Sequence, residues 1–160
     1  MDAAERREFV RGHRVAVFGY NRRRHGPAMT IVYYVMDGDD ILVSTMAARA
    51  KARAVQRDPH VSLCVLDEQW PPSYLLVYGT ARIVTEFERV VDLRMRIAGL
   101  MAEQPIPESH RPHIADSTRR EQRIILRVSP YQTFESPPRH VYTPEDVKGL
   151  THDLGTSLPW

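Results

Sequence analysis

Residues 28–45 read AMTIVYYVMDGDDILVST. The first nine of these are rich in β-branched and aromatic side chains, which favour strands, and residues 41–45 are a second, shorter run of the same kind. Between them, Asp37-Gly38-Asp39-Asp40 has the composition of a tight turn. An apolar run at residues 15–20 and a turn at residues 21–27 precede the stretch, so this part of the chain predicts three strands in a meander.

The next segments alternate between helix and strand patterns. Residues 2–13 and the alanine-rich residues 47–57 are predicted as helices. Asp58-Pro59 ends the second helix, because the residue before a proline avoids helical backbone angles. Residues 61–66 and 73–84 are predicted as strands.

A third predicted helix follows these strands. Thr85 and Glu88 have the spacing of a capping box, which predicts a helix that begins there and runs to about Ala102. Residues 108–122 are polar and compatible with a further helix.

The last predicted strands are residues 123–128 and 131–135, and Gly79 marks an expected bulge in an earlier one. The total is about seven antiparallel strands with two or three helices. Long strands at short spacing favour a mainly β fold, an antiparallel barrel with flanking helices.

The composition limits the classes of protein that the chain can belong to. A length of 160 residues with 42% hydrophobic and 26% charged residues is typical of one globular domain. The longest apolar run, Ile31 to Met36, is too short to span a bilayer, and the first residues lack the apolar core of a signal peptide. Cys64 has no second cysteine to pair with. We therefore expect a cytoplasmic protein without membrane contact.

The basic residues argue against bulk binding of nucleic acid, because the net charge is only +2. Arg22-Arg23-Arg24 lies in a predicted turn, where it fits either a solvated tip or an anion contact. No nucleotide-binding, metalloprotease or serine-hydrolase motif is present. The histidines are scattered, so the sequence assigns neither metal ligands nor a catalytic residue.

The segment from Ser44 to Lys51 combines hydroxyl side chains with cationic ones. Ser44 and Thr45 place hydroxyls at the end of a predicted strand, and Arg49 and Lys51 follow at the start of a predicted helix. Hydroxyls, helix N–H groups and fixed cations together form a phosphate-binding corner. The same residues also suit a solvated alanine-rich helix, and this segment by itself leaves both interpretations open.

Three patterns in combination resemble a known family. Residues 43–53 carry Ser-Thr followed by Arg-x-Lys, residues 57–63 begin with Arg-Asp-Pro, and residues 74–81 read YLLVYGTA. Their order and spacing resemble the split β-barrel flavin-binding family, whose best-known member is pyridoxamine 5'-phosphate oxidase. The oxidases usually have adjacent Arg-Lys, whereas Ala50 separates the two cations here, which is similar to the actinobacterial branch that uses the deazaflavin coenzyme F420. The resemblance covers roughly residues 12–135.

The resemblance implies a split β-barrel of the FMN-binding type over residues 1–136 and a homodimer with two cofactor sites at its interface. Ser44, Thr45, Arg49 and Lys51 would hold the cofactor phosphate. The strand Met29, Thr30, Ile31 and Val32 would run along the flavin or deazaflavin ring with its backbone. Tyr74 would contact the ring from the other subunit.

The resemblance also implies an enzyme, an oxidoreductase that transfers hydride between coenzyme F420 and a small electron-poor substrate such as an enone or imine. Two alternatives stay open: an FMN-dependent oxidoreductase of the same family, and a non-catalytic carrier of flavin, F420 or haem. A nucleic-acid-binding module that uses Arg22–Arg24 and the helix at residues 49–57 is disfavoured by the low net charge. Oxidation of pyridoxamine phosphate is not expected, since residues 137–160 lack a match to the family's substrate-phosphate residues.

Two further expectations concern the substrate pocket and the tail. Met29, Tyr33, Tyr34 and Trp70 are candidate neighbours of the substrate, with core packing as the alternative for each. Residues 137–160 form a tail with a predicted helix start at Thr143 and an aromatic end at Trp160. We expect this tail to pack across the dimer near the cofactor cleft, with disorder as the alternative.

Overall fold

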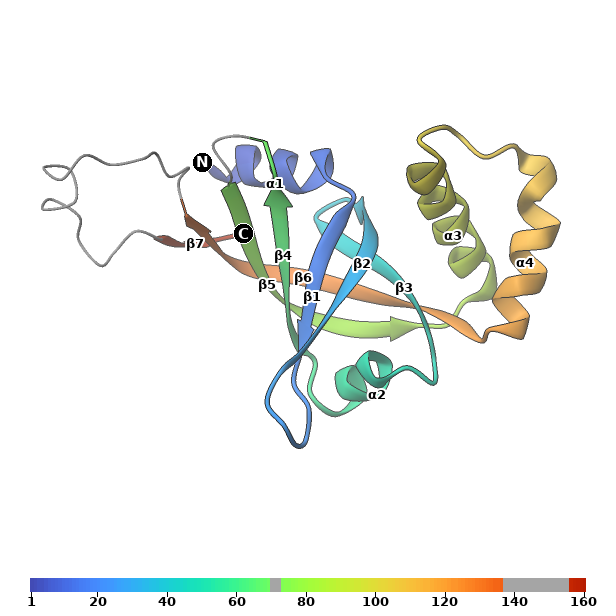
Figure 1. Ribbon diagram of the computed structural model, residues 1–160, viewed down its shortest axis with the longest axis horizontal. Helices are drawn as coiled ribbons and strands as arrows, with labels where there is room; N and C mark the ends of the chain where they lie inside the picture. Colours follow the sequence, from blue (N-terminus) through green and yellow to red (C-terminus); the bar gives the residue numbers. More distant parts are fainter. Residues whose placement is uncertain (70–72, 137–155) are drawn as a thin grey trace, which may run out of the picture.

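Seven antiparallel strands form a single sheet in the computed structural model, which describes residues 1–69, 73–136 and 156–160. The strands are β1 (Val15–Tyr20), β2 (Ala28–Asp37), β3 (Asp40–Met46), β4 (His60–Asp67), β5 (Ser73–Val84), β6 (Arg123–Ser136) and β7 (Thr156–Pro159). Their order is β3-β2-β1-β4-β5-β6-β7, and β3 also pairs with β6. This last pairing closes six strands into a barrel (Figure 1). The expected mainly β split barrel is therefore confirmed.

The helices flank the barrel rather than fill it. They are α1 (Ala3–Gly12), α2 (Ala50–Arg57), α3 (Phe87–Ala102), the short 3-10 helix η1 (Glu108–His110) and α4 (Arg111–Arg120). Figure 1 shows α1 at one end of the barrel, α2 at the other, and the pair α3 and α4 beside it. Among the described residues, no helix is long and apolar enough to cross a membrane.

The barrel interior is built from alternate residues of each strand, as the period of a β-strand requires. Phe18, Leu63 and Val77 are fully buried there. Tyr34 is also buried, and its hydroxyl donates a 2.6 Å hydrogen bond to the carbonyl oxygen of Val10 in α1. Burial raises the pKa of the Tyr34 phenol. Tyr34 is thus a core residue, and its role as a substrate neighbour is not supported.

One strand was predicted as two, because a proline interrupts it. β6 runs through Pro130 without a break, opposite Gly79 of β5, and the pairing register shifts between Tyr78 and Gly79. A Cβ atom at Gly79 would lie 2.5 Å from Val128 Cγ1 and 3.0 Å from the carbonyl oxygen of Ser129. The irregularity expected at Gly79 is present, but its extra residue is Tyr131 on the opposing strand β6, and the missing side chain of Gly79 leaves room for the proline.

The predicted capping box at Thr85 is wrong. α3 begins one residue later than that motif requires, with Glu86 as its N-cap, and no side chain bonds the cap. α1 instead carries a capping box: the side chain of Asp2 accepts from the Glu5 N–H, and Glu5 accepts from the Asp2 N–H.

Two rows of outward residues from five strands form an uncharged surface, which we call the outer face. Adjacent strands align these residues, and every one of them is exposed or half-buried. The rows are Ile31, Val17, Cys64, Leu76 and Phe134, and Met29, Gly19, Ser62, Tyr78 and Gln132. Ile31 and Met29 are 75% and 72% exposed, so the outer face is apolar and open at β2.

The C-terminal strand belongs to the sheet of its own chain. β7 pairs with residues 132–135 of β6, and Trp160 packs against the barrel core. The guanidinium of Arg7 lies 5.6 Å from the Trp160 ring centroid. The helix predicted at Thr143 lies outside the described residues, and packing of the tail across a dimer stays a prediction.

Candidate functional site

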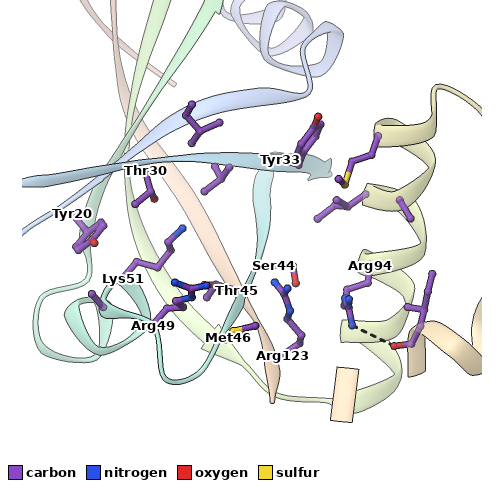
Figure 2. A pocket seen from close by; sticks show the side chains of 17 residues that line it. Tyr20, Thr30, Tyr33, Ser44, Thr45, Met46, Arg49, Lys51, Arg94 and Arg123 are labelled. Atoms are coloured by element: carbon purple, nitrogen blue, oxygen red, sulfur yellow. Dashed lines mark hydrogen bonds between the residues drawn. The ribbon is translucent and has the colours of Figure 1, made fainter. Parts of the chain in front are cut away.

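A cleft opens in the barrel wall where β2 and β3 separate. The two strands pair only from Tyr34↔Val43 to Asp37↔Asp40. Beyond that point Ser44, Thr45 and Met46 of β3 pair with β6 instead. Residues 28–33 of β2 pair with β1 on one side and, within the described residues, with no strand on the other. Their free edge borders a cleft of about 610 Å³ (Figure 2).

Four cations and no carboxylate lie among the described residues that line this cleft: Arg49, Lys51, Arg94 and Arg123. Figure 2 shows the side chains of Arg49 and Lys51 reaching into the cleft from the α2 side, and Arg123 reaching in beside Ser44. Because four positive charges surround one space, the cleft favours an anionic group.

Arg123 reaches the cleft through a tight turn between α4 and β6. Gln122 has φ of +50°, in the left-handed region, and its carbonyl oxygen accepts a 3.0 Å hydrogen bond from the Ala47 N–H. Met46 and Arg123 are direct partners in the β3–β6 ladder. The start of β6 is therefore fastened to the loop that leads to Arg49.

The four cations are not equally available to a ligand. One terminal nitrogen of Arg94 donates to the hydroxyls of Ser117 and Thr118, at 2.9 and 2.8 Å, and so ties α3 to α4. Arg123 donates from Nε to Glu121, and the described residues give its terminal nitrogens no hydrogen-bond partner. Arg49, Lys51 and Arg123 are the cations left to meet an anion.

The surroundings of Lys51 disfavour the charged form of its amine. Burial lowers its pKa most, and repulsion from Arg49 and Arg123 lowers it further. An anion in the cleft would reverse both effects, since it would compensate for lost hydration and screen the neighbouring charges. Anion binding would thus stabilise the charged form of Lys51.

The hydroxyls of the cleft add a second sign of a ligand. Thr30 Oγ1 and Ser44 Oγ are buried, and neither has a hydrogen-bond partner among the described residues. Buried polar atoms usually have partners. Both side chains line the cleft, so polar groups of a bound molecule could supply the missing bonds. α2 also begins here, and the side chain of its N-cap residue, Arg49, makes no capping hydrogen bond, which suits an anion at this helix end.

The other end of the cleft is apolar. It is lined by Tyr33 of β2, by Ile97, Ala98 and Met101 of α3, and by Ile114 of α4. Figure 2 shows Tyr33 near the end of β2 that lies beside α3. The cleft therefore has a cationic end and an apolar end.

Most residues expected to bind the cofactor line this cleft. They are Thr30, Ile31, Val32, Ser44, Thr45, Arg49 and Lys51. Met29 and Tyr74 do not line the cleft of their own chain: Met29 lies on the outer face, and Tyr74 is on β5, opposite Leu66 of β4. Of the candidate substrate neighbours only Tyr33 lines it, and Trp70 lies outside the described residues.

The sequence patterns did not indicate several lining residues, chiefly Arg94, Ile97, Met101, Ile114 and Arg123. They come from segments far along the chain from Ser44. No local motif marks them, because only the closure of β3 on β6 brings them to the cleft.

Comparisons with known proteins agree with this architecture. A family model described as pyridoxamine 5'-phosphate oxidase matches residues 3–135. No curated protein matches the sequence.

Several solved structures share the fold. The conserved hypothetical protein Rv2991 from Mycobacterium tuberculosis is 21% identical with a TM-score of 0.74, over 91% of this chain and 94% of that one. An F420 reductase is 21% identical with a TM-score of 0.59, over 75% and 88%. An FAD-binding protein from Mesorhizobium loti is 14% identical with a TM-score of 0.59, over 83% and 92%. At these identities the likeness concerns the fold alone.

Proposed function

The chain belongs to the pyridoxamine 5'-phosphate oxidase family, and from that premise we propose that it is an oxidoreductase that binds coenzyme F420 in the cleft. The family is one of flavin- or deazaflavin-binding oxidoreductases. The proposed reaction is the reduction of a small electron-poor organic substrate. The observation that carries the proposal is the cationic end of the cleft, where Arg49, Lys51 and Arg123 converge beside the free edge of β2.

The residues present fit a phosphate-bearing ring cofactor. Arg49 and Lys51 would hold the phosphate, with the start of α2 beneath it. The unpartnered hydroxyls of Thr30 and Ser44 are suited to polar groups of the cofactor. The free edge of β2 would offer backbone N–H and C=O groups to the polar edge of a planar ring, and so orient it along residues 29–32.

When bound, such a cofactor supplies the hydride chemistry itself, and the protein supplies position and electrostatics. The cations would hold its anionic arm, the free edge of β2 would orient its ring, and α3 lines one side of the cleft. No described residue that lines the cleft is a carboxylate or a histidine, which is consistent with a cofactor that supplies the chemistry itself. The Arg-x-Lys spacing at Arg49 and Lys51 is the feature that favours F420 over FMN.

We further propose that the protein acts as a homodimer, with the outer face as its interface. Ile31 and Met29 are largely exposed on this face, and its two rows carry no charge. Burial of such a face against a second copy would remove an apolar patch from water. Tyr74 lies on the outward side of β5, which supports a place for it in the partner's cleft.

The cofactor is identified most directly by purification from a host that makes both F420 and FMN, followed by the absorption spectrum of what co-purifies. The spectrum of F420 would support the proposal, and that of FMN would move the protein to the flavin branch. Titration of the cofactor-free protein with each compound gives the two dissociation constants. Turnover of an enone with the reduced cofactor then separates an enzyme from a carrier.

A further inference from the structure

The connection between β5 and β6 is much longer than the sheet requires. These neighbouring strands pair from Tyr74↔Ser136 to Val84↔Ile125, so a short hairpin turn could join them. Residues 85–122 instead form α3, η1 and α4. Figure 1 shows this insertion beside the barrel, where it plays no part in closing the sheet.

The insertion is anchored firmly to the barrel. A second hydrophobic core joins α3 to β2, β3, β5 and β6, and it consists of Val35, Leu42, Val84, Val90, Leu93 and Ile125. Arg96 donates to the Met36 carbonyl oxygen at 2.8 Å. Arg14 donates to the Leu100 carbonyl oxygen at 2.9 Å and to Glu103 at 2.7 Å. α3 is therefore a fixed wall next to the end of β2.

One face of this wall is turned to the cleft. Arg94, Ile97, Ala98 and Met101 follow the spacing of three and four residues that places side chains on one side of a helix, and all four line the cleft. Met101 is 59% exposed, so its thioether offers apolar surface that no described residue fully covers. Tyr33 provides the opposite wall from β2.

The charges around this end define what could occupy it. Arg94 is the cation of α3 that lines the cleft, and its terminal nitrogens are engaged by Ser117, Thr118 and, at 3.7 Å, Glu121. No described carboxylate lines the cleft to attract a cationic ligand. A neutral apolar molecule loses least hydration on entering, and it gains contact with Ile97 and Met101.

We propose that the slot between Tyr33 and the pair Ile97 and Met101 is the substrate subsite, that it takes the apolar body of a neutral ring compound, and that Met101 sets the size it accepts. The role as a substrate subsite rests on the proposed function; the binding of a neutral apolar ring does not. The inserted helices thus supply specificity, while α2 and β6 supply cofactor affinity.

The slot is tested by the binding of cyclohexenone and the larger enone carvone to the cofactor-free protein and to the protein with oxidised cofactor, by ligand-observed NMR. Met101→Trp, which fills the slot, should weaken carvone binding at least about tenfold. Met101→Ala should favour carvone over cyclohexenone relative to the wild type. Met95→Trp is the matched control, because Met95 is on the same helix but lines a different cavity.

The outcomes separate this inference from the proposed function. Loss of carvone binding in Met101→Trp, with cofactor affinity and Met95→Trp both within about twofold of the wild type, supports the slot. Wild-type protein that binds no carvone, or Met101→Trp that binds it undiminished, overturns the slot. Failure of the wild type to bind F420 or FMN overturns the proposed function alone, since carvone binding is read without cofactor.

Discussion

Glu121 accepts a 2.6 Å hydrogen bond from Nε of Arg123 and lies 3.7 Å from a terminal nitrogen of Arg94. This carboxylate orients Arg123 towards the cleft without itself lining it. Arg123 in turn lowers the pKa of Glu121, so the carboxylate is ionised at neutral pH. Glu121 therefore both positions the third cation of the anion site and competes with an anion for it.

The double role of Glu121 can be separated by two substitutions. Glu121→Gln keeps an oxygen that can accept from Arg123 but removes the competing charge, so we expect cofactor affinity to rise about two- to five-fold. Glu121→Ala removes the positioning bond as well, and we expect no such gain. Titrations at low and high salt measure both effects, since the gain should shrink as salt screens the charges. A weaker cofactor complex in Glu121→Gln would contradict the competition.

Lys51 and Arg53 should differ in their effect on the cofactor. Lys51 lines the cleft, whereas the guanidinium of Arg53 donates to the Ala48 carbonyl oxygen at 2.8 and 3.2 Å. Lys51→Ala should remove a charge-assisted hydrogen bond of about 1.5–3 kcal/mol, which is roughly tenfold or more in affinity. Arg53→Ala is the control on the same helix. Equal losses in the two variants would remove Lys51 from the site.

The pH dependence of cofactor binding follows from the lowered pKa of Lys51. Its cause is chiefly burial, and then Arg49 and Arg123. The folded chain binds the proton of the Lys51 amine less tightly than the unfolded chain does. The free energy of unfolding therefore decreases as pH falls from 10.5 through the lowered pKa of Lys51. Cofactor affinity depends on pH in the opposite sense, because an anionic group binds the charged amine more tightly than the neutral one. Affinity should therefore fall as pH rises through the lowered pKa of Lys51.

Two variants isolate this effect from the titration of the cofactor itself. Lys51→Arg keeps its charge at alkaline pH, so its affinity should stay level where that of the wild type falls. Lys51→Met should raise the melting temperature of the cofactor-free protein and reduce the stabilisation that the cofactor adds. Dissociation constants measured from about pH 7 to pH 10 test the first expectation, and thermal unfolding with and without cofactor tests the second. Identical pH profiles for wild type and Lys51→Arg would assign the titration elsewhere.

The sequence predicted the barrel well, because its strands are marked by local composition and its turns by residues such as Gly38, which has φ of +62°. It also indicated the cofactor corner at Ser44 to Lys51, because those residues are close in the chain. Where the prediction failed, the deciding contact lay elsewhere in the fold. Pro130 appeared to end a strand, since nothing near it reveals the opposing Gly79.

The missed part of the site has the same explanation. Arg123 is only a basic residue at a strand start until β3 pairs with β6 and places it beside Met46. Arg94 and Met101 belong to a helix whose apolar spacing indicates packing, and that spacing does not distinguish the face on the second core from the face on the cleft. Thr85 matched a capping motif, but the backbone turns into α3 only after Glu86.

The outer face predicts the effect of a charge at the proposed dimer interface. Met29→Glu places a carboxylate in an uncharged row, opposite Gly19, at a residue that does not line the cofactor cleft. We expect the dissociation constant of the dimer to rise at least about tenfold, because the charge would have to be buried without a partner. Light scattering at micromolar concentration measures it, and Ser109→Glu on exposed η1 is the control. A wild-type protein that is already monomeric under these conditions would contradict the dimer.

The C-terminal strand predicts a linked effect on stability and on the partner's cleft. Trp160 packs on the core and lies near the guanidinium of Arg7, so Trp160→Ala should lower the free energy of unfolding by about 1–3 kcal/mol. β7 pairs with residues 132–135 of β6, the end of that strand away from Arg123 and next to Tyr74 of β5. β7 thus lies at the end of β6 opposite Arg123 and close to the residue expected to reach the partner's cleft.

If the tail acts across the dimer, its effect on cofactor binding must depend on the dimer. Deletion of residues 156–160 should weaken cofactor binding in the otherwise wild-type protein, and the further loss should be absent when Met29→Glu has already separated the subunits. The loss of unfolding free energy should persist in both backgrounds, because the contact of Trp160 with Arg7 lies within one chain. Cofactor titration and chemical unfolding of the four proteins provide this double-mutant cycle. An equal loss of cofactor affinity in both backgrounds would place the effect of the tail within its own subunit.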